Sequence, residues 1–537
     1  AQINEYKYFV VKENEKYGVI NTNGDIIIEA KYDDIKIPNP EKAVFICYEN
    51  KKTKVLNEKG EEIFTQYEDI QPLRLKNVIS DLMYEKTTLK YSKNGKYGII
   101  DIEGKKITNP IYEDIDTLQF KEGELLVKKD GKYGVINIKG TTIVKTQYDG
   151  IESDRYYEEE TGYKKSGYIV SKTTDEGYRY GYVNIEGKQI IENKYNDLYR
   201  VTDIDSKNIY IICAENGQYG LMKDGKQIIN NEYQSIVYNE SNDTITALKG
   251  KKYGVFSIEG KQIVPFEYKQ IDTTGEYIYA TSNDENVKIF DTDGKEANID
   301  SNLAILDVEN TDYKIYINTA DGKTIYTIYK NGKAITKNEY VYIEYLNNNY
   351  FIACNSEGKL GVIDENENTK IAFNYNSIQK IEGTDLVQTT QNDTNTIEIY
   401  SKDLSKITEL KNGNIEKHTD YIKLYNNDEI KYVSKDGKEI KNIELFKDNK
   451  IFANKWGDKW GFVDKNGNKI VDYNYDKVTE VNKYGFAGIE KDGLWGVVDS
   501  NGKIIVEPQY KLNDIEPTFI GEYYQVTYGN GEIYYTK

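Results

Sequence analysis

Residues that commonly perform catalysis are scarce in this chain of 537 residues. It has one histidine, His418, and none of its serines or cysteines lies in a motif typical of a nucleophile. Acidic residues are abundant, and two carboxylates could hydrolyse a glycosidic bond. However, Asp33, Asp149 and Asp476 each follow a tyrosine at a recurring place, which favours a role as hydrogen-bond acceptors in turns. We therefore expect no catalytic residues and interpret His418 as an exposed loop residue.

Three turns have oxygen-rich sequences similar to calcium loops, at residues 21–25, 291–294 and 464–468. They lack the glycine at the sixth position and the glutamate at the twelfth that the helix–loop–helix calcium site requires. No glycine-rich phosphate loop leads from a strand into a helix. We therefore expect neither a metal ion nor a cofactor.

The best candidate for partner binding is an insertion at residues 152–165, between two well-formed repeats. Insertions of this kind are where repeat arrays carry specific functions. This one is rich in aromatic and acidic side chains: Tyr156, Tyr157, Glu158, Glu159, Glu160 and Tyr163. Two interpretations remain open, a partner-binding surface and a mobile acidic loop.

These candidates lie on a scaffold that repeats the pattern of residues 16–35 along the chain. The pattern is an aromatic–glycine pair, two apolar residues, a turn ending in glycine, an apolar run and a Tyr–Asp pair; residues 495–510 repeat its parts as far as the final tyrosine. A third β-rich run precedes each aromatic–glycine pair, so the sequence predicts three antiparallel strands per repeat. Aligning the turn glycines gives roughly fourteen repeats of about 37 residues.

The marker glycines lie inside predicted strands, for example Gly18, Gly134 and Gly496. Glycine weakens a strand unless another group must come close, so we expect a neighbouring aromatic ring to cover each of them. The tyrosine of the Tyr–Asp pair should pack between repeats and hydrogen-bond at the rim, although a ladder of exposed rings for stacking on sugars is the alternative.

The composition supports an all-β protein with many short strands. The chain has 51 Tyr, 42 Gly, 7 Pro and 2 Met, and its formal net charge of −18 disfavours nucleic acid and anionic membranes as partners. No apolar run is long enough for a transmembrane helix. Residue 1 is Ala, which suggests a mature chain after signal cleavage, although a trimmed chain would explain it equally well.

The regularity of the markers divides the chain into three segments. Residues 1–280 form a regular array, with a short helix expected near residues 74–88 and the acidic loop at 152–165. Residues 281–445 are degenerate repeats, and residues 446–537 are regular again and end in a truncated repeat, as expected of a cap or of strands that close a ring. We expect an open β-repeat superhelix or solenoid, with tandem β-propellers as the alternative.

Cys47, Cys213 and Cys354 align with Val11, Val127, Ala247 and Ile489 when counted back from the marker pair or its degenerate equivalent. A place shared with small apolar residues predicts buried thiols, not disulfides or metal ligands.

Residues 459–471, which include Trp460-Gly461 and the turn glycine Gly467, resemble the WG-repeat family of bacterial tandem repeats. Residues 495–510 resemble it too, while earlier repeats have tyrosine in place of tryptophan. The resemblance implies surface-associated or scaffold proteins without a common catalytic activity, and therefore no active-site residues.

We expect a non-enzymatic, extracellular or cell-surface adhesion protein that presents an extended surface to a protein or glycan partner, with self-association as a further option. An intracellular interaction scaffold is the alternative, and a glycan-active enzyme is a third hypothesis.

Overall fold

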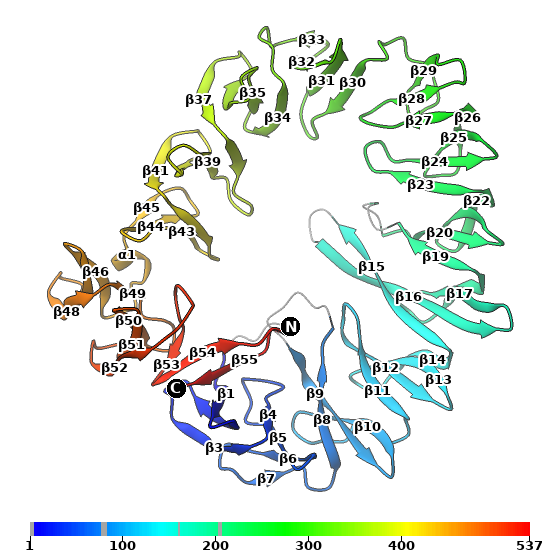
Figure 1. The fold of residues 1–537 in the computed structure, drawn as a ribbon. Coiled ribbons are helices and arrows are strands. Elements are labelled where there is room, and N and C mark those ends of the chain that lie inside the picture. Colours follow the sequence, from blue (N-terminus) through cyan, green and yellow to red (C-terminus); the bar gives the residue numbers. More distant parts are fainter. Residues whose placement is uncertain (1–4, 77–82, 159–161, 202–203, 205–206) are drawn as a thin grey trace. The chain divides into compact units, whose positions relative to one another are not determined.

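The computed structural model describes residues 5–76, 83–158, 162–201, 204 and 207–537. Within these residues the chain forms fourteen small sheets, ten of them with four strands, and one short helix, α1 (Asn442–Leu445). Figure 1 shows that almost every sheet is built from strands that are consecutive in the chain. The all-β prediction is therefore confirmed. Each sheet is called a blade below.

The strands run through the chain at short intervals. Those of the first part are β1 (Tyr8–Glu13), β2 (Lys16–Asn21), β3 (Ile26–Tyr32), β4 (Asp34–Lys36), β5 (Phe45–Glu49), β6 (Lys52–Leu56), β7 (Glu62–Ile63), β8 (Glu68–Arg74), β9 (Tyr84–Lys93), β10 (Lys96–Asp101), β11 (Asp114–Leu118), β12 (Lys121–Lys129), β13 (Lys132–Asn137), β14 (Thr142–Tyr148), β15 (Gly150–Glu158), β16 (Gly162–Thr174), β17 (Gly177–Val183), β18 (Gln189–Tyr195), β19 (Asp197–Arg200), β20 (Tyr210–Glu215), β21 (Gln218–Lys223) and β22 (Lys226–Tyr233).

The remaining strands continue the same rhythm. They are β23 (Ser235–Asn239), β24 (Thr244–Lys249), β25 (Lys252–Ser257), β26 (Gln262–Tyr268), β27 (Gln270–Asp272), β28 (Ile278–Thr281), β29 (Val287–Phe290), β30 (Leu303–Asp307), β31 (Tyr313–Ala320), β32 (Lys323–Lys330), β33 (Lys333–Ala334), β34 (Tyr342–Asn347), β35 (Tyr350–Cys354), β36 (Leu360–Asp364), β37 (Thr369–Tyr375), β38 (Ser377–Lys380), β39 (Val387–Gln391), β40 (Thr396–Tyr400), β41 (Lys406–Lys411), β42 (Asn414–Lys417), β43 (Tyr421–Tyr425), β44 (Ile430–Ser434), β45 (Glu439–Ile440), β46 (Phe452–Trp456), β47 (Lys459–Val463), β48 (Lys469–Tyr475), β49 (Lys477–Val478), β50 (Phe486–Lys491), β51 (Leu494–Asp499), β52 (Ile504–Tyr510), β53 (Phe519–Ile520), β54 (Tyr523–Thr527) and β55 (Ile533–Thr536).

The typical blade has four strands, where the sequence predicted three. The residues that directly follow the tyrosine of the Tyr–Asp pair form a further short strand, such as β4, which pairs with β5 of the next repeat. The blade order β4-β5-β6-β7 is therefore offset from the repeat by one strand. A strand of three residues, such as Asp34–Lys36, is too short to show an alternating pattern. The sequence therefore did not reveal it.

The marker glycines lie opposite a wide β-bulge in the last strand of the blade. Tyr133 faces Tyr148 and Val135 faces Val144, so three residues of β14 lie opposite Gly134 alone. A Cβ atom on Gly134 would lie 2.5 Å from the Val144 carbonyl oxygen, and one on Gly181 would lie 2.6 Å from that of Ile191. Only a residue without a side chain allows this approach of two backbones.

The expectation that a ring covers every marker glycine is therefore wrong for most of them. Rings come close at Gly254 (Phe266), Gly361 (Phe373) and Gly98 (Tyr91), whereas backbone atoms are nearest at Gly18, Gly134, Gly181, Gly220, Gly461 and Gly496. Where the glycine is missing, the bulge can be missing too. In the β38–β41 blade, β40 and β41 pair residue for residue from Thr396 to Ile399.

The Tyr–Asp pair connects neighbouring blades, as the sequence predicted. Tyr32, Tyr148 and Tyr195 are buried. One carboxylate oxygen of Asp149 accepts from Lys132 Nζ at 2.5 Å and the other accepts from the backbone N–H of Thr173 in the next blade at 2.7 Å. Asp33 and Asp476 make the equivalent pairs of bonds. The lysine hydrogen bond, followed by the backbone hydrogen bond, lowers the pKa of Asp149.

The hydrophobic core lies between the faces of neighbouring blades. In one such layer, Val135 and Val144 of one blade pack with Tyr168 and Val170 of the next. By contact density the chain divides into two compact units, residues 1–231 with 448–537 and residues 232–447. The degenerate repeats keep the hairpin rhythm: within residues 303–440 the blades have four strands each.

The two ends of the chain share one sheet. β1 pairs with β2 on one side and, in parallel at Val11 and Tyr535, with β55 on the other, which gives the order β3-β2-β1-β55-β54-β53 (Figure 1). Phe9 and Val11 pack there with Ile520 and Tyr523. Joining both ends in one sheet is how β-propellers close, so the propeller alternative matches the structure.

Two local predictions need correction. Residues 84–93, where the expected helix would end, are strand β9; Leu75 N–H donates to the Met83 carbonyl, and residues 77–82 lie outside the described residues.

Cys47 and Cys213 are buried as predicted, but Cys354 pairs with Leu360 and is only half-buried, whereas Ala353 faces Gly361. A longer turn after Cys354 shifts the alignment by one residue.

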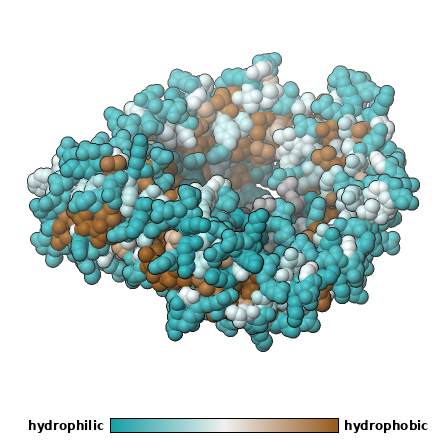
Figure 2. Space-filling model, turned by 60° about the horizontal axis from the view of Figure 1, so that its bottom comes forward, coloured by the Kyte–Doolittle hydropathy of each residue, from teal (hydrophilic) through white to brown (hydrophobic). Residues whose placement is uncertain are grey.

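The face of the molecule in Figure 2 is mostly hydrophilic, with smaller hydrophobic patches among polar residues. This agrees with the mean hydropathy of −0.72. Among the described residues, no helix is both long enough and apolar enough to cross a membrane.

Replacing Gly134 by Ala should destabilise the protein by roughly 1–3 kcal/mol, because the new methyl group would overlap the Val144 backbone. Thermal melting followed by circular dichroism measures the effect. Gly529→Ala is the matched control, since nothing lies within 4 Å of that position. Equal melting temperatures for the two variants would contradict the bulge argument.

Replacing Asp149 by Asn should lower the free energy of unfolding by about 1 kcal/mol at pH 7. Because the folded-state pKa of Asp149 is lowered, its contribution is present above the unfolded value of 3.8 and disappears as the pH falls through the folded value. Urea unfolding of both proteins at several pH values should show the difference shrinking below about pH 4. A difference that stays constant into acid would rule out the ion pair as its cause.

Candidate functional site

The segment predicted as a partner-binding surface or a mobile loop is mostly a β-hairpin. Tyr156, Tyr157 and Glu158 lie on β15, and Tyr163 lies opposite Tyr157 on β16. Tyr157 and Tyr163 are 40% and 52% exposed, and their ring centroids are 5.3 Å apart. Glu159 and Glu160 lie outside the described residues. Partner binding by this hairpin stays a prediction.

Cation–π contacts and buried charges hold the base of this hairpin. The Arg155 guanidinium lies 3.8 Å from the ring centroids of both Phe120 and Tyr163. Beneath it, Arg200 and Asp154 form a buried ion pair at 2.5 Å, and Asp154 also accepts from the Tyr182 hydroxyl at 2.6 Å. The described part of the segment is therefore an extension of its blade's hairpin, and the acidic tip of the predicted loop lies outside the described residues.

A buried lysine lies close to the same hairpin. Lys121 is fully buried, donates to the Ser166 carbonyl and has its Nζ 4.0 Å from the Tyr168 ring centroid. Its Nζ lies 3.6 Å from Glu124 Oε2. Burial lowers the pKa of Lys121 to about 8. Because no part of Lys121 reaches the surface, we assign it a role in the core of the blade and not in ligand binding.

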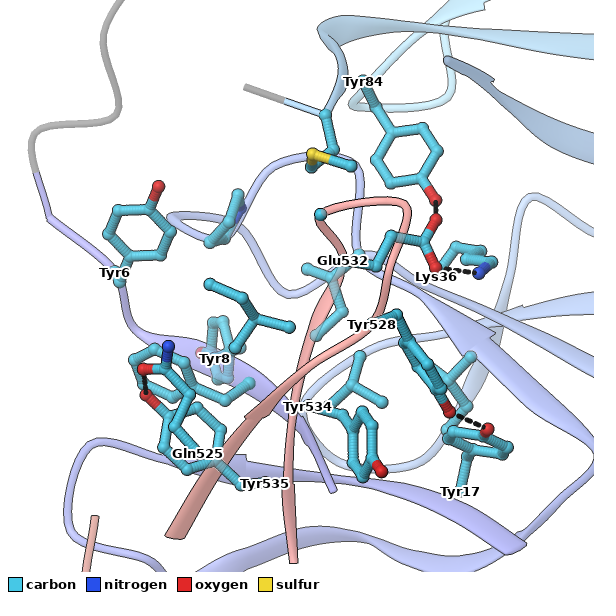
Figure 3. Close-up of a pocket in the computed structure, with 18 of the residues that line it drawn as sticks. Tyr6, Tyr8, Tyr17, Lys36, Tyr84, Gln525, Tyr528, Glu532, Tyr534 and Tyr535 are labelled. Carbon is cyan, nitrogen blue, oxygen red and sulfur yellow. Dashed lines mark hydrogen bonds and ion pairs between the residues drawn. The ribbon is translucent and has the colours of Figure 1, made fainter. Parts of the chain in front are cut away.

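A concave site that was not predicted from the sequence lies near the joined ends of the chain. It is a pocket of about 1100 Å³ beside the sheet that joins the chain's ends, and Figure 3 shows its lining. Eight of the lining residues are tyrosines, contributed by the N-terminal segment, β1, β2, β9, the loop before β50, and the β54–β55 hairpin: Tyr6, Tyr8, Tyr17, Tyr84, Tyr484, Tyr528, Tyr534 and Tyr535.

Several tyrosine hydroxyls are held by neighbouring side chains. The Tyr17 and Tyr528 hydroxyls share a hydrogen bond at 2.5 Å, and the Tyr535 hydroxyl donates to Gln525 at 3.1 Å (Figure 3). The Tyr534 ring lies 4.6 Å from that of Tyr528. These contacts fix the ring orientations, so the pocket presents preorganised aromatic walls. Burial raises the pKa of Tyr528 to about 12, so this hydroxyl stays protonated at neutral pH.

Glu532, in the β54–β55 turn, is the charged centre of one wall. Its carboxylate accepts from the Tyr84 hydroxyl at 2.7 Å and pairs with Lys36 at 2.9 Å and with Arg74 at 2.5 Å. Burial opposes ionisation, but the hydrogen bonds from Tyr84 and Lys36 and the two cations outweigh it and lower the pKa of Glu532. At neutral pH this group is an ionised acceptor and not a proton donor.

The other sequence candidates do not line this pocket. The tyrosines of the β15–β16 hairpin do not line it, and His418 stacks on Tyr421 with its Nε2 2.9 Å from Glu416 in the other compact unit. The side chain of His418 is one-third exposed. The pocket combines residues from both ends of the chain, and the truncated last repeat was its only signal in the sequence.

The oxygen-rich turns are explained by their own backbones. Asn21, Asp291 and Asp464 each accept the N–H groups two and four residues ahead through one side-chain oxygen. Among the described residues, no group of three or more His, Cys, Asp or Glu side chains is arranged to hold a metal ion.

Replacing Glu532 by Gln should lower the free energy of unfolding by roughly 2 kcal/mol at pH 7, because Lys36 and Arg74 lose a partly buried charged partner. Since the folded-state pKa is lowered, this loss should fade as the pH falls below the unfolded value of 4.5.

The control is Glu522→Gln, which removes a solvent-exposed pair with Lys537 and should change stability by less than about 1 kcal/mol. Chemical denaturation of the three proteins gives the comparison. Equal stability of the two variants would contradict the role assigned to Glu532.

Comparison with solved structures gives weak similarities. They include a eukaryotic initiation factor (10% identity, 76% of this chain and 96% of that chain, TM-score 0.25), PorZ, a bacterial surface component of the type-IX secretion system of Porphyromonas gingivalis (10%, 94% and 82%, 0.17), and Hsv2p of Kluyveromyces lactis (13%, 56% and 96%, 0.21). These scores are low, and no statement about function rests on them. Curated proteins give no match.

The sequence pattern of one repeat family does match the chain. The WG containing repeat matches residues 17–51, 97–133, 133–156, 460–495 and 495–512. These stretches include the aromatic–glycine pairs at Tyr17, Tyr97, Tyr133, Trp460 and Trp495. The matches lie in the regular blades at both ends of the chain, as the resemblance of the Trp–Gly segments predicted. The chain therefore contains WG repeats at these five places.

Proposed function

We propose that this protein is a non-enzymatic binding protein and that its tyrosine-lined pocket binds a neutral glycan. One observation carries the proposal: eight tyrosines line a cavity of about 1100 Å³. A pyranose ring has a face of C–H groups that packs on the negative face of an aromatic ring, while its hydroxyls need polar partners at the edge.

The pocket supplies both kinds of contact. Tyr528 and Tyr534 form neighbouring aromatic walls, and Gln525, Asn530 and Thr518 add amides and a hydroxyl to the lining. Its volume suits a short stretch of sugar units, since small-molecule sites generally occupy roughly 300–1,000 Å³. A folded protein partner would need a contact of about 800 Å² on each side, for which a concave pocket is a poor match.

Charge favours a neutral ligand over an acidic one. The cations Lys36 and Arg74 beside the pocket are already paired with Glu532. The whole chain has a net charge of −18, which repels polyanions at long range. A third cation, Lys483, lines the pocket and lies over the rings of Tyr6 and Tyr484. The long-range field therefore carries the preference for a neutral ligand.

The proposal includes the absence of catalysis. Glycoside hydrolysis needs a carboxylic acid that is protonated at working pH. The pKa of Glu532 is lowered, because Tyr84, Lys36 and Arg74 stabilise its ionised form, so it is not such an acid. Exposure at a cell surface belongs to the same proposal, and fractionation of cells that produce the protein tests it against the scaffold alternative inside the cell.

Calorimetric titration with maltohexaose, cellohexaose, laminarihexaose and chitohexaose tests the pocket. We expect at least one to bind, with affinity roughly tenfold weaker in Tyr528→Ala and Tyr534→Ala, because each loses a stacking face. Tyr528→Phe, which keeps the ring, should retain binding. Tyr178→Ala, at a 58% exposed tyrosine outside the pocket, is the control.

The proposal fails if none of the four sugars binds, or if the two pocket variants bind as well as the control. Release of new reducing ends from any of these sugars would contradict the non-enzymatic part while leaving the binding site in place.

A further inference from the structure

Trp456, at the end of β46, is the most exposed large hydrophobic residue in the described part of the chain. Its exposed fraction is 73%. It is followed by the turn residues Gly457 and Asp458 and pairs across the turn with Lys459. An indole in this place contributes nothing to the core between blades. Core packing therefore does not explain why a tryptophan occupies this position.

Other blades show what this place normally holds. It is the residue that precedes the two-residue turn before the strand of the marker pair or its degenerate equivalent. In the other described blades with such a turn it is charged or small: Glu13, Glu49, Lys93, Lys129, Thr174, Glu215, Lys249, Ala320 and Lys491. These side chains suit solvent at a hairpin tip. Trp456 departs from that pattern.

A second departure lies in the same blade, on the same face of the same strand. Asn454 faces Gly461, a place that holds Val11, Val127, Val170, Cys213, Ala247 or Ile489 in other blades. Its amide donates to the Tyr473 hydroxyl at 2.8 Å. The Tyr473 and Trp456 ring centroids are 6.1 Å apart, with 32° between the ring planes. Asn454 therefore holds Tyr473 beside the exposed indole.

We propose that Trp456 and Tyr473 form a second glycan-binding site, a surface platform that stacks on one or two sugar rings of a neutral chain. An exposed indole with a half-buried tyrosine ring at a shallow angle beside it offers the C–H faces of a pyranose an aromatic surface. Lys459, which pairs with Trp456 across the turn and forms an ion pair with Asp476, offers a charged group to the sugar hydroxyls. Asp472, the residue before Tyr473, forms a second ion pair with Lys469.

The size and charge of the platform decide against other occupants. Two rings cover far less than the roughly 800 Å² that each side of a stable protein interface buries. The net charge of −18 disfavours nucleic acid, which also stacks on aromatic rings. The choice of ligand class rests on the proposed function, but the geometry is independent of the pocket, which Trp456 and Tyr473 do not line.

Tryptophan fluorescence distinguishes the platform from the pocket. The chain has three tryptophans, of which Trp495 is 3% exposed, Trp460 is partly buried and none lines the pocket. Quenching by acrylamide therefore reports mainly on Trp456. We expect saturating concentrations of at least one of maltohexaose, cellohexaose, laminarihexaose and chitohexaose to remove most of this quenching in the full-length protein.

Two variants sharpen the test. Asn454→Val introduces the residue type that Val11 has at the equivalent position of its blade. It keeps the indole but removes the hydrogen bond that holds the Tyr473 ring. The apparent sugar affinity, measured by protection from quenching, should therefore fall roughly threefold or more. Tyr534→Ala, in the pocket, should leave the protection unchanged. If Tyr534→Ala weakens the calorimetric binding assigned to the pocket while the sugar concentration that protects the indole stays the same, the two sites are separate as proposed.

Lack of protection by all four sugars overturns the platform, whatever the pocket does. Protection that rises with protein concentration in the absence of sugar would show that a second copy of the chain covers Trp456, and it would overturn the proposal as well. Unchanged protection in Asn454→Val would remove the role assigned to the Asn454–Tyr473 hydrogen bond.

Discussion

The regular blades depend on one close approach between backbones. Opposite most marker glycines the last strand bulges, and its carbonyl group comes so near that no side chain fits, as at Gly134 and Val144. The bulge turns the strand toward the Tyr–Asp corner, where a buried tyrosine and a hydrogen-bonded aspartate fix the start of the next blade. Glycine, tyrosine and aspartate therefore recur together because they serve a single corner.

Much of this scaffold follows from sequence periodicity. The number of repeats, the hairpins and the recurring tyrosines are visible as local patterns. An acceptor role was predicted for Asp149 as well, but its partners Lys132 and Thr173 lie 17 and 24 positions away. The fourth strand of the blade was not predicted, because the three residues Asp34, Ile35 and Lys36 are too few to show a pattern. Cys354 was misplaced because a longer turn broke the count.

The candidate pocket could not be predicted for a different reason. Tyr17 and Tyr528 share a hydrogen bond although 511 positions separate them, and no local pattern indicates which distant segments will meet. The β15–β16 hairpin was located correctly as an irregular insertion, but its order comes from Arg155, Asp154 and Arg200, whose contacts are again non-local.

Residues that follow the repeat pattern and residues that depart from it have different roles. Positions that obey the repeat build the blades, and positions that depart from it, such as Trp456 and the tyrosines at the joined ends, carry the proposed recognition of sugars. Hydrogen–deuterium exchange with a bound neutral hexasaccharide tests this division most directly. We expect slower exchange confined to residues 525–535 and 454–473, with regular strands such as β24 and β25 unchanged. Slower exchange spread evenly over the regular blades, or none at either site, would contradict it.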